Sequence, residues 1–598
     1  MDIINGIIEG IGNFFSVIPE SVGNVFEATS DAGHIYTAFA RWIFIFLALF
    51  ILLKMIMSLL KSRNPSEVWA YLHVGEYENL PLTHWENNIG RAKSCDIQIN
   101  DLSVSRNHGI LTRDDDGDWR YMDLGAKNGA YINGRKVPSG HEMGVKIGDT
   151  IQLGAVRCTL FPISLQERQN NIRYRQEDTV LPSPWPSLLA LTIFQMLTLG
   201  ELYYALGEDF NAQIPISFIG MAVLMWVYVI LLWGMHRRAF EMEIIAFFLS
   251  TLSLAVMAAS IPGEVLKQFI SVVIGVGLFF FMCTFLRDLE RTRAIKKYVY
   301  IAAVLLLLIN MIFGTTINGS TNWVRIAGMT FQPSELVKLA FIWVGAATMD
   351  ELFDRKSSLR FSAFAVFCFL CLAKIGDLGA AAIFFATYLV ISFLRSGDFA
   401  RLLSIGGVAF VAALLVLKFR SYAVDRLNTW GHIWEPDFIN NSGFQQTRSL
   451  TDAASGGLIG LGAGRGNLRF INASETDMVF CFLAEEWGLI VAVMAVLAIV
   501  TLSIFAYRSI MSGRSTYYTI AACSAMTLFL LQTILNVFGS TDILPFTGVA
   551  FPFTSAGGTS MIASWGLLAF LKAADTRQNA SIAVSLKDKA VAGGGEGL

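Results

Sequence analysis

The sequence predicts a polytopic α-helical membrane protein with about 13 transmembrane helices and one inserted all-β domain. Three observations indicate this class. Hydrophobic residues make up 54% of the 598-residue chain and charged residues only 15%, the mean hydropathy is +0.53, and one polar, turn-rich stretch interrupts the apolar runs. This composition excludes an ordinary soluble enzyme. A formal net charge of -2 gives no basis for attracting nucleic acid, so no nucleic-acid partner is expected.

The first apolar run, residues 37–63, is predicted to be a transmembrane anchor. It is too long for the core of a signal peptide, and no small-residue cleavage site follows it. Acidic residues dominate residues 1–36, whereas Lys61 and Arg63 follow the apolar run. The positive-inside rule therefore places the N-terminal segment outside a bacterial cytoplasmic membrane and the next domain in the cytoplasm.

Residues 66–165 form the predicted all-β domain. Short alternating runs such as Asp96–Ile99 and Ala130–Asn133 are typical of strands, and Asn-Gly, Asp-Gly and Ser-Gly pairs between such runs indicate turns. A linker with several prolines follows at residues 166–186.

The rest of the chain reads as nearly continuous membrane helix. Two helices are expected within residues 187–234 and a larger helical domain within residues 243–573, with a cytoplasmic tail at 574–598. The strongly basic short loops all fall on one side of the membrane when the helices are followed in order. This orientation places the long polar loop at 419–477 outside the cell membrane.

Asp477 lies where that loop re-enters the membrane, with Glu485 and Glu486 close behind it in the sequence. A carboxylate at a membrane surface is costly, so we expect it to serve chemistry. The seven cysteines show no spacing typical of a disulfide framework or a metal site, and no metal ligands are predicted.

Motifs in the all-β domain resemble the forkhead-associated (FHA) domain. They occur in order as Gly90-Arg91, Ser105-Arg106-Asn107-His108, Asp123-Leu124-Gly125-Ala126-Lys127-Asn128-Gly129 and Asn133-Gly134. The resemblance implies a β-sandwich whose loops hold a phosphothreonine, and hence a threonine-phosphorylated protein or a Ser/Thr kinase as partner.

By this resemblance, Arg91 and Ser105 would bind the phosphate, Arg106 would assist, and Asn128 would hold the peptide backbone. Lys127 stands where the family usually has Thr, so it adds a phosphate contact or alters ligand choice. The alternative is a sandwich that only docks proteins, with Arg91 in a surface salt bridge.

Four collinear segments resemble the SEDS family of polytopic cell-wall polymerases, whose members include FtsW, RodA and SpoVE. They are Asn318–Lys338, Gly376–Gly379, Gly443–Leu489 and Ile543–Ser560. The resemblance implies ten membrane helices of the SEDS type, so the anchor and the two helices at 187–234 are additions.

The resemblance implies a peptidoglycan glycosyltransferase that joins the disaccharide units of lipid II and works with a class B penicillin-binding protein. Asp477 matches the essential loop aspartate of the family, and it would be the general base that takes the proton of the acceptor hydroxyl. The polymerase would release undecaprenyl pyrophosphate, so a cation must stabilise negative charge. Lys338 is the first candidate, and a divalent cation held by carboxylates is the alternative.

The substrate-binding residues implied by these motifs are Glu335, Lys338, Asp377, Gln445, Arg448, Glu485 and Glu486. Because Glu335 and Lys338 lie three residues apart on a helix, they can pair, either as a structural salt bridge or at the substrate. Asp377 opens a helix, where capping is an alternative role.

Asn322 stands where the family usually has Arg, and Arg325 is the candidate for replacing that cation. Two other function classes fit the chain. A lipid II flippase would have buried charges and broken helices, and a signalling scaffold would carry an inactive SEDS-like domain.

Overall fold

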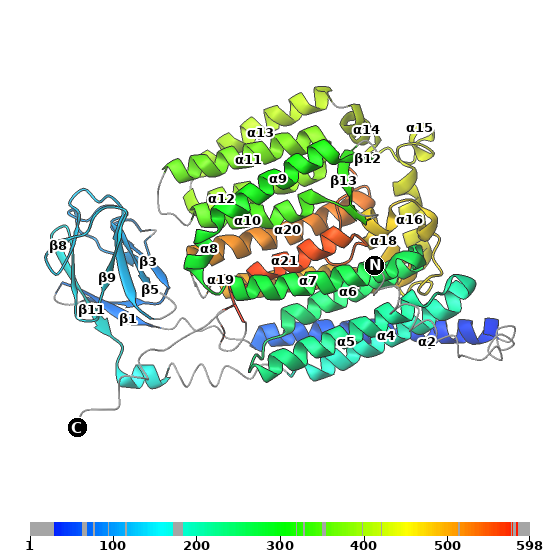
Figure 1. The fold of residues 1–598 in the computed structure, drawn as a ribbon, viewed down its shortest axis with the longest axis horizontal. Helices are drawn as coiled ribbons and strands as arrows, with labels where there is room; N and C mark the ends of the chain where they lie inside the picture. Colours follow the sequence, from blue (N-terminus) through cyan, green and yellow to red (C-terminus); the bar gives the residue numbers. More distant parts are fainter. Residues whose placement is uncertain are drawn as a thin grey trace.

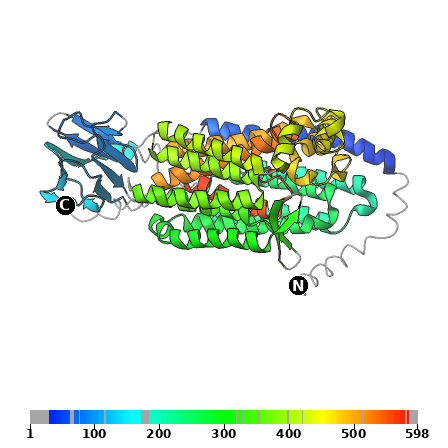
Figure 2. The ribbon, with the colours of Figure 1, turned by 90° about the horizontal axis from the view of Figure 1, so that it is seen from above.

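The computed structural model consists of a β-sandwich and a large helical module, which lie side by side along the long axis of the molecule (Figures 1 and 2). It describes residues 29–61, 68–75, 78–93, 95–113, 117–170, 183–317, 320–326, 329–349, 355–396, 399–419, 421–511, 515–575, 577 and 582–583. Most of the predicted segments 1–36 and 574–598, and part of the linker 166–186, lie outside the described residues.

The sandwich contains two sheets, with the strand orders β2-β1-β11-β10-β7-β8 and β4-β3-β5-β6-β9. The strands of the first sheet are β2 (Glu78–Leu82), β1 (Ala70–Val74), β11 (Val156–Pro162), β10 (Thr150–Leu153), β7 (Ala130–Ile132) and β8 (Arg135–Lys136). Those of the second are β4 (Ile97–Gln98), β3 (Glu86–Gly90), β5 (Gly109–Arg113), β6 (Trp119–Asp123) and β9 (Glu142–Val145).

Inward-facing apolar side chains fill the space between the two sheets. Leu72, Ile89, Leu111, Tyr121 and Leu160 each have no measurable exposure. Each comes from a different strand, and burial alternates along β1, β6 and β11, as the period of two in a β-strand requires. The predicted all-β class of this region is confirmed.

Thirteen helices of 16 or more residues make up the helical module in the described part of the chain. They are α2 (Thr29–Lys61), α4 (Trp185–Leu206), α5 (Gln213–Gly234), α6 (Glu241–Ser260), α7 (Val265–Phe285), α9 (Lys296–Phe313), α10 (Pro333–Met349), α11 (Arg355–Ile375), α12 (Leu378–Ser396), α13 (Phe399–Phe419), α19 (Gly488–Met511), α20 (Thr516–Ser540) and α21 (Gly558–Ala573).

Nine stretches within the described residues are long and apolar enough to cross a membrane, and α12 and α13 contain shorter apolar runs. The chain is therefore a multi-pass membrane protein, and the predicted helical class is confirmed. The predicted number of 13 spans is not confirmed.

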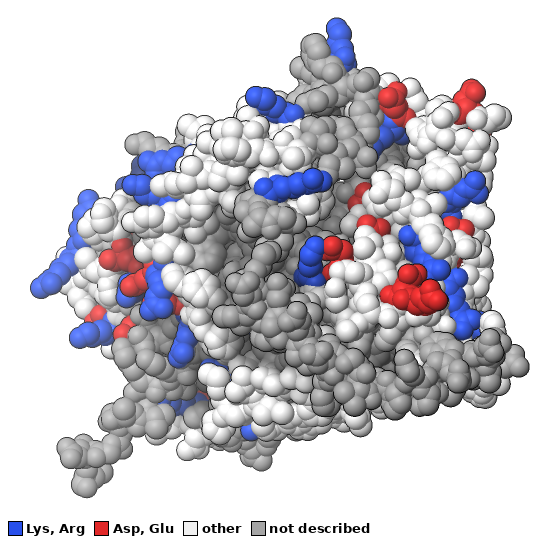
Figure 3. Space-filling view, turned by 45° about the vertical axis from the view of Figure 1, so that its right-hand side comes forward, with Lys and Arg blue, Asp and Glu red and all other residues white. Residues whose placement is uncertain are grey.

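The helical module has two chemically different ends. The end next to the sandwich, which we call the sandwich end, includes the short helix α8 (Leu289–Ala294). The opposite end, the loop end, carries α14 (Ser421–Thr429), α15 (Pro436–Ile439), α16 (Phe444–Gly456), α17 (Ser474–Asp477) and α18 (Val479–Glu486). It also carries a small sheet of β12 (Thr315–Ile317), β13 (Ser320–Ile326) and β14 (Met329–Phe331). Figure 3 shows acidic and basic side chains lying beside one another over this end.

The sandwich touches the helical module through charged and polar side chains. Glu86, at the start of β3, accepts a hydrogen bond from the backbone N–H of Thr516 at the start of α20 (3.3 Å). Arg120 lies 3.8 Å from Glu290 in α8. The predicted phosphate-binding loops follow the opposite ends of these strands, so they lie away from this contact.

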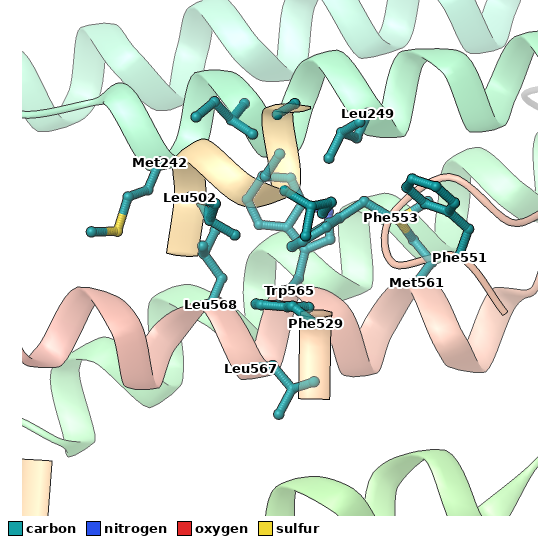
Figure 4. Close-up of a cluster of buried hydrophobic side chains, with 14 of the residues drawn as sticks. Met242, Leu249, Leu502, Phe529, Phe551, Phe553, Met561, Trp565, Leu567 and Leu568 are labelled. Atoms are coloured by element: carbon teal, nitrogen blue, oxygen red, sulfur yellow. The ribbon is translucent and has the colours of Figure 1, made fainter. Parts of the chain in front are cut away.

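Trp565 of α21 lies at the centre of the helical core (Figure 4). Its ring has no exposed surface and lies 4.9 Å from the ring of Phe247 and 5.8 Å from that of Phe553, measured between centroids. Gly275 of α7 faces it so closely that a Cβ atom there would be 2.9 Å from Trp565 Cδ1. This contact fixes the spacing between α7 and α21.

We predict that Trp565→Ala destabilises the helical module by roughly 3 to 5 kcal/mol, because it leaves a large cavity in a closely packed core. The measurement is the thermal unfolding midpoint of the purified chain in detergent. Trp434→Ala is the matched control, since Trp434 is 58% exposed at the loop end. Equal shifts of the midpoint for the two variants would contradict this role of Trp565.

Candidate functional site

A polar cavity of about 890 Å³ opens at the loop end of the helical module. Helices α10, α12, α14, α16 and α17, strand β13 and the segment after α20 all contribute side chains to its wall. The predicted residues that line it are Glu335, Lys338, Asp377, Gln445 and Asp477. Segments more than 200 residues apart in the sequence therefore meet here.

Asp477 is held by its backbone. Three successive carbonyl groups accept hydrogen bonds: Glu475 O from Ala556 N (2.8 Å), Thr476 O from Ser555 Oγ (2.6 Å) and Asp477 O from Asn536 Nδ2 (3.1 Å). Two separate segments, α20 and the turn before α21, supply these donors. The orientation of α17 is thus fixed without using the Asp477 carboxylate.

The Asp477 side chain is consequently available to the cavity. Gly548 lies against it with φ +64°, and a Cβ atom at that position would be 3.0 Å from Asp477 Oδ2. Burial raises the pKa of Asp477 to about 6, whereas a hydrogen bond from the Thr476 side chain and the charge of Arg426 act in the opposite direction. A carboxylate with this pKa is mostly ionised near neutral pH and is basic enough to take up a proton.

Glu335 and Lys338 form the ion pair that their spacing predicts. Lys338 Nζ lies 2.6 Å from Glu335 Oε1, with the two side chains only 2% and 8% exposed. Both residues line the cavity. A buried pair of this kind keeps a cation at the cavity wall while compensating its charge.

Asp377 combines two contacts. Its Oδ1 accepts a hydrogen bond from Ala380 N (2.9 Å), which caps the first turn of α12, and its Oδ2 accepts one from Asn322 Nδ2 (2.9 Å). The first contact is the helix cap that the sequence offered as an alternative role for Asp377. Asp377 also lines the cavity, so it has both positions at once. Asn322, the departure from the family pattern, is thus a neutral partner for this carboxylate.

Sequence reasoning missed Arg426 in α14. Its side chain lines the cavity and donates a hydrogen bond to Phe546 O (2.8 Å). Asp377 and Asp477 line the same cavity. Burial lowers the pKa of Arg426, and the charges of Asp477 and Asp377 oppose that shift. The amphipathic pattern of residues 421–429 is the feature of the sequence that could have indicated a helix here with Arg426 on its polar face. Arg325, the predicted substitute cation, is exposed on β13 and is not among the cavity-lining residues.

Three predicted substrate-binding residues lie outside the cavity wall. Arg448 is exposed beside the ring of Phe444. Glu485 accepts hydrogen bonds from Asn467 N (2.6 Å) and Leu468 N (3.0 Å). Glu486 accepts one from Gly464 N (2.9 Å). The two glutamates are therefore bound to the backbone of the preceding loop, where peptide N–H groups bond both carboxylate oxygens of Glu485 and one of Glu486.

Gln445 lines the cavity at the start of α16, and its side-chain amide donates to Asn472 O (2.9 Å). This bond ties α16 to the segment that leads into α17. No three His, Cys, Asp or Glu side chains come together as a metal-binding group among the residues that the structure describes.

The second candidate site is on the β-sandwich, where the predicted phosphate-binding residues come together. Arg91 N donates to Ser105 O (3.0 Å), Lys127 N donates to Ser105 Oγ (3.1 Å), and Asn128 Nδ2 donates to Ser103 O (2.8 Å). Arg106 accepts a bond from Ala92 N through its backbone carbonyl (3.0 Å). Two arginines, a lysine and a hydroxyl at one set of loop ends are suited to binding an anion.

His108 supports these loops from beneath. It is fully buried, its Nδ1 accepts a hydrogen bond from Ser105 N (3.1 Å), and its Nε2 lies 3.1 Å from Gly129 O. Because a carbonyl only accepts, Nε2 carries the proton. Burial lowers the pKa of His108, which favours this neutral form.

The fold and its two candidate sites define a multi-pass membrane protein with a cavity lined by charged side chains at one end and a β-sandwich with basic loop residues at the other. The family model described as "Cell cycle protein", FtsW/RodA/SpoVE, matches residues 239–580, and the model of the FHA domain matches residues 87–154. The chain belongs to the FtsW/RodA/SpoVE family and carries an FHA domain. Helices α2, α4 and α5 precede the matched family region.

Relatives include "Probable peptidoglycan glycosyltransferase FtsW" of Escherichia coli, which is 25% identical over 377 residues, covering 57% of this chain and 90% of that protein. "Peptidoglycan glycosyltransferase RodA" of Mycobacterium bovis is 28% identical over 331 residues, covering 51% of this chain and 69% of that protein. A chain from a solved peptidoglycan synthase complex is 22% identical with a TM-score of 0.45, covering 56% of this chain and 96% of that one.

Proposed function

We propose that this protein is a peptidoglycan glycosyltransferase that polymerises lipid II, with Asp477 as the general base. One observation carries the proposal. Asp477, Lys338 and Arg426 line the same cavity of about 890 Å³. Family membership and the names of the relatives support the same reaction class.

The proposed reaction needs a base and a stabilised leaving group. Asp477 takes the proton of the acceptor sugar hydroxyl while that oxygen forms a bond to the anomeric carbon of the donor. The bond from the anomeric carbon to the diphosphate oxygen breaks, and undecaprenyl pyrophosphate leaves with the electron pair. A positioned carboxylate contributes on the order of a hundredfold to ten-thousandfold in rate to such a proton transfer.

Lys338 and Arg426 are the cations that we propose for the developing diphosphate charge. Each is fixed by a hydrogen bond, Lys338 to Glu335 (2.6 Å) and Arg426 to Phe546 O (2.8 Å). Preorganised positive groups of this kind stabilise charge that develops in a transition state.

We also propose that the loop end faces outside the cytoplasmic membrane, as the distribution of basic loops indicates. The sandwich end, with the FHA domain and the C-terminus, then lies in the cytoplasm and the N-terminus outside. By the family resemblance, a class B penicillin-binding protein is the proposed partner at the outer face.

For the FHA domain we propose recognition of a threonine-phosphorylated partner. Arg91, Ser105, Arg106 and Lys127 surround the proposed phosphate position, and Asn128 is placed for the peptide backbone. Support comes from the loop contacts, and from the position of these loops away from the contacts of Glu86 and Arg120 with the helical module. A partner can therefore reach them.

We predict that Asp477→Ala reduces polymerisation of lipid II by at least about a hundredfold, because the base is lost. The assay uses the purified chain in detergent or liposomes with lipid II, with and without a class B penicillin-binding protein. Asp437→Ala is the control, since Asp437 is an exposed aspartate of α15 in the same loop region and does not line the cavity; it should retain activity.

Polymer formation by Asp477→Ala at the wild-type rate would contradict the base assignment. Movement of lipid II across the liposome membrane without polymer would favour the flippase instead. No activity of either kind would favour a scaffold.

We predict that Arg91→Ala weakens binding of a phosphothreonine peptide by about tenfold to a hundredfold, as expected for loss of a charge-assisted hydrogen bond. Titration calorimetry of the full chain in detergent measures this. Arg168→Ala is the control, because Arg168 follows β11 at the other end of the sandwich. Equal affinity of the native chain for phosphorylated and plain peptide would rule out the proposed recognition.

A further inference from the structure

The N-terminal part of α2 and the C-terminal part of α4 lie beside a glycine-rich loop at the loop end of the molecule. We call residues 457–466 the glycine loop, because Gly457, Gly460, Gly462, Gly464 and Gly466 lie within it. The two helices precede the family match at 239–580, whereas the glycine loop lies inside it. A contact between them is therefore specific to this chain architecture.

Two charged side chains make this contact. Glu201 of α4 accepts a hydrogen bond through Oε2 from Ala463 N (2.9 Å), and Arg41 of α2 donates one to Gly460 O (3.0 Å). Glu201 is only 1% exposed, and its second oxygen, Oε1, has no hydrogen-bond partner in the described structure. A buried carboxylate on a membrane helix is costly, which makes simple packing a poor explanation for it.

The opposite side of the glycine loop is bound to α18. Leu461 N donates to Glu485 O and Gly462 N donates to Glu486 O, both at 2.9 Å. Gly464 N donates to the Glu486 carboxylate (2.9 Å). The loop is thus held between α4 on one side and α18 on the other.

The approach is close enough to require glycine. A Cβ atom at Gly462, where φ is +109°, would lie 2.5 Å from Thr37 Cγ2 of α2. One at Gly460, where φ is +82°, would lie 2.2 Å from Glu486 O. The backbone of the loop is therefore packed tightly between α2 and α18, and a shift of α2 or α4 would displace the loop against α18.

The glycine loop leads directly to the proposed base. Asn467 N and Leu468 N donate to Glu485, and the chain then passes through a short 3₁₀ turn at Leu468–Phe470. Asp477 N donates to Ala473 O (2.9 Å) in the next turn, α17. The chain thus runs from the glycine loop, which is bound to Glu485 and Glu486 at the C-terminal end of α18, to Asp477, which directly precedes the N-terminal end of the same helix. The bonds of the loop add to those that Asn536, Ser555 and Ala556 make with residues 475–477.

We propose that Glu201, assisted by Arg41, is a positioning residue that fixes the glycine loop and thereby the placement of Asp477 in the cavity. This inference rests on the proposed function of Asp477. It assigns to the helices outside the family region a part in building the reactive site. The ligand of Glu201 is the loop backbone of the same chain, so no substrate contact is involved.

The test compares three variants of the full-length chain. Glu201→Ala removes the acceptor for Ala463 N, and Glu201→Gln keeps an acceptor oxygen in the same place. Gln195→Ala is the matched control, because Gln195 lies on the same helix and makes a buried hydrogen bond to Thr251 Oγ1 (2.9 Å) without touching the loop.

We expect Glu201→Ala to lower kcat for lipid II polymerisation by about tenfold to a hundredfold, since small displacements of a catalytic group have effects of this size. The value of KM should change by less than about twofold, because no substrate contact is lost. Glu201→Gln should recover most of kcat, and Gln195→Ala should keep it. A loss of kcat in Glu201→Ala no greater than that in Gln195→Ala would overturn the proposal.

Hydrogen exchange of residues 457–477 gives a readout that does not depend on activity. Glu201→Ala should exchange faster there than the wild type, with Gln195→Ala unchanged. Unchanged exchange in Glu201→Ala would refute the positioning role even if polymerisation failed. Absence of polymer from the wild type, with faster exchange in Glu201→Ala, would instead reject only the proposed function.

Discussion

The placement of Asp477 depends on three hydrogen bonds to its own backbone and that of the two preceding residues. The carbonyl groups of residues 475, 476 and 477 each have a separate donor, and the donors come from α20 and from the turn before α21. Backbone groups at a membrane boundary must be satisfied within the protein. Here that requirement also leaves the carboxylate free for the cavity.

Both cations at the cavity lie near carboxylates. Lys338 lies against Glu335, and Arg426 lines the same wall as Asp377 and Asp477. A buried cation without a carboxylate near it would be too costly, so these neighbours are a condition for having cations at the cavity at all. The FHA domain is inserted between α2 and α4, and both helices reach the loop end.

Local patterns predicted the parts that depend on local physics. Strand alternation indicated the sandwich, apolar runs indicated the helices, and a spacing of three predicted the pairing of Glu335 with Lys338. Contacts between distant segments could not be predicted this way. Arg426 carries no motif, and Glu485 and Glu486 look suited to a cavity until the fold shows the backbone amides that surround them. The sequence identified Asp477 as a candidate catalytic residue. It did not identify Asn536 and Ser555, which donate hydrogen bonds to the carbonyl groups of residues 477 and 476.

The most direct test of the central claim is the pH dependence of kcat/KM for lipid II polymerisation by the wild-type chain. Since burial raises the pKa of Asp477 to about 6, and the base must be ionised to act, the rate should rise about tenfold per pH unit below this value and level off above it. The intact fold is checked at each pH by its thermal unfolding. A rate that stays constant from about pH 5 to 7.5 would contradict general-base catalysis by Asp477.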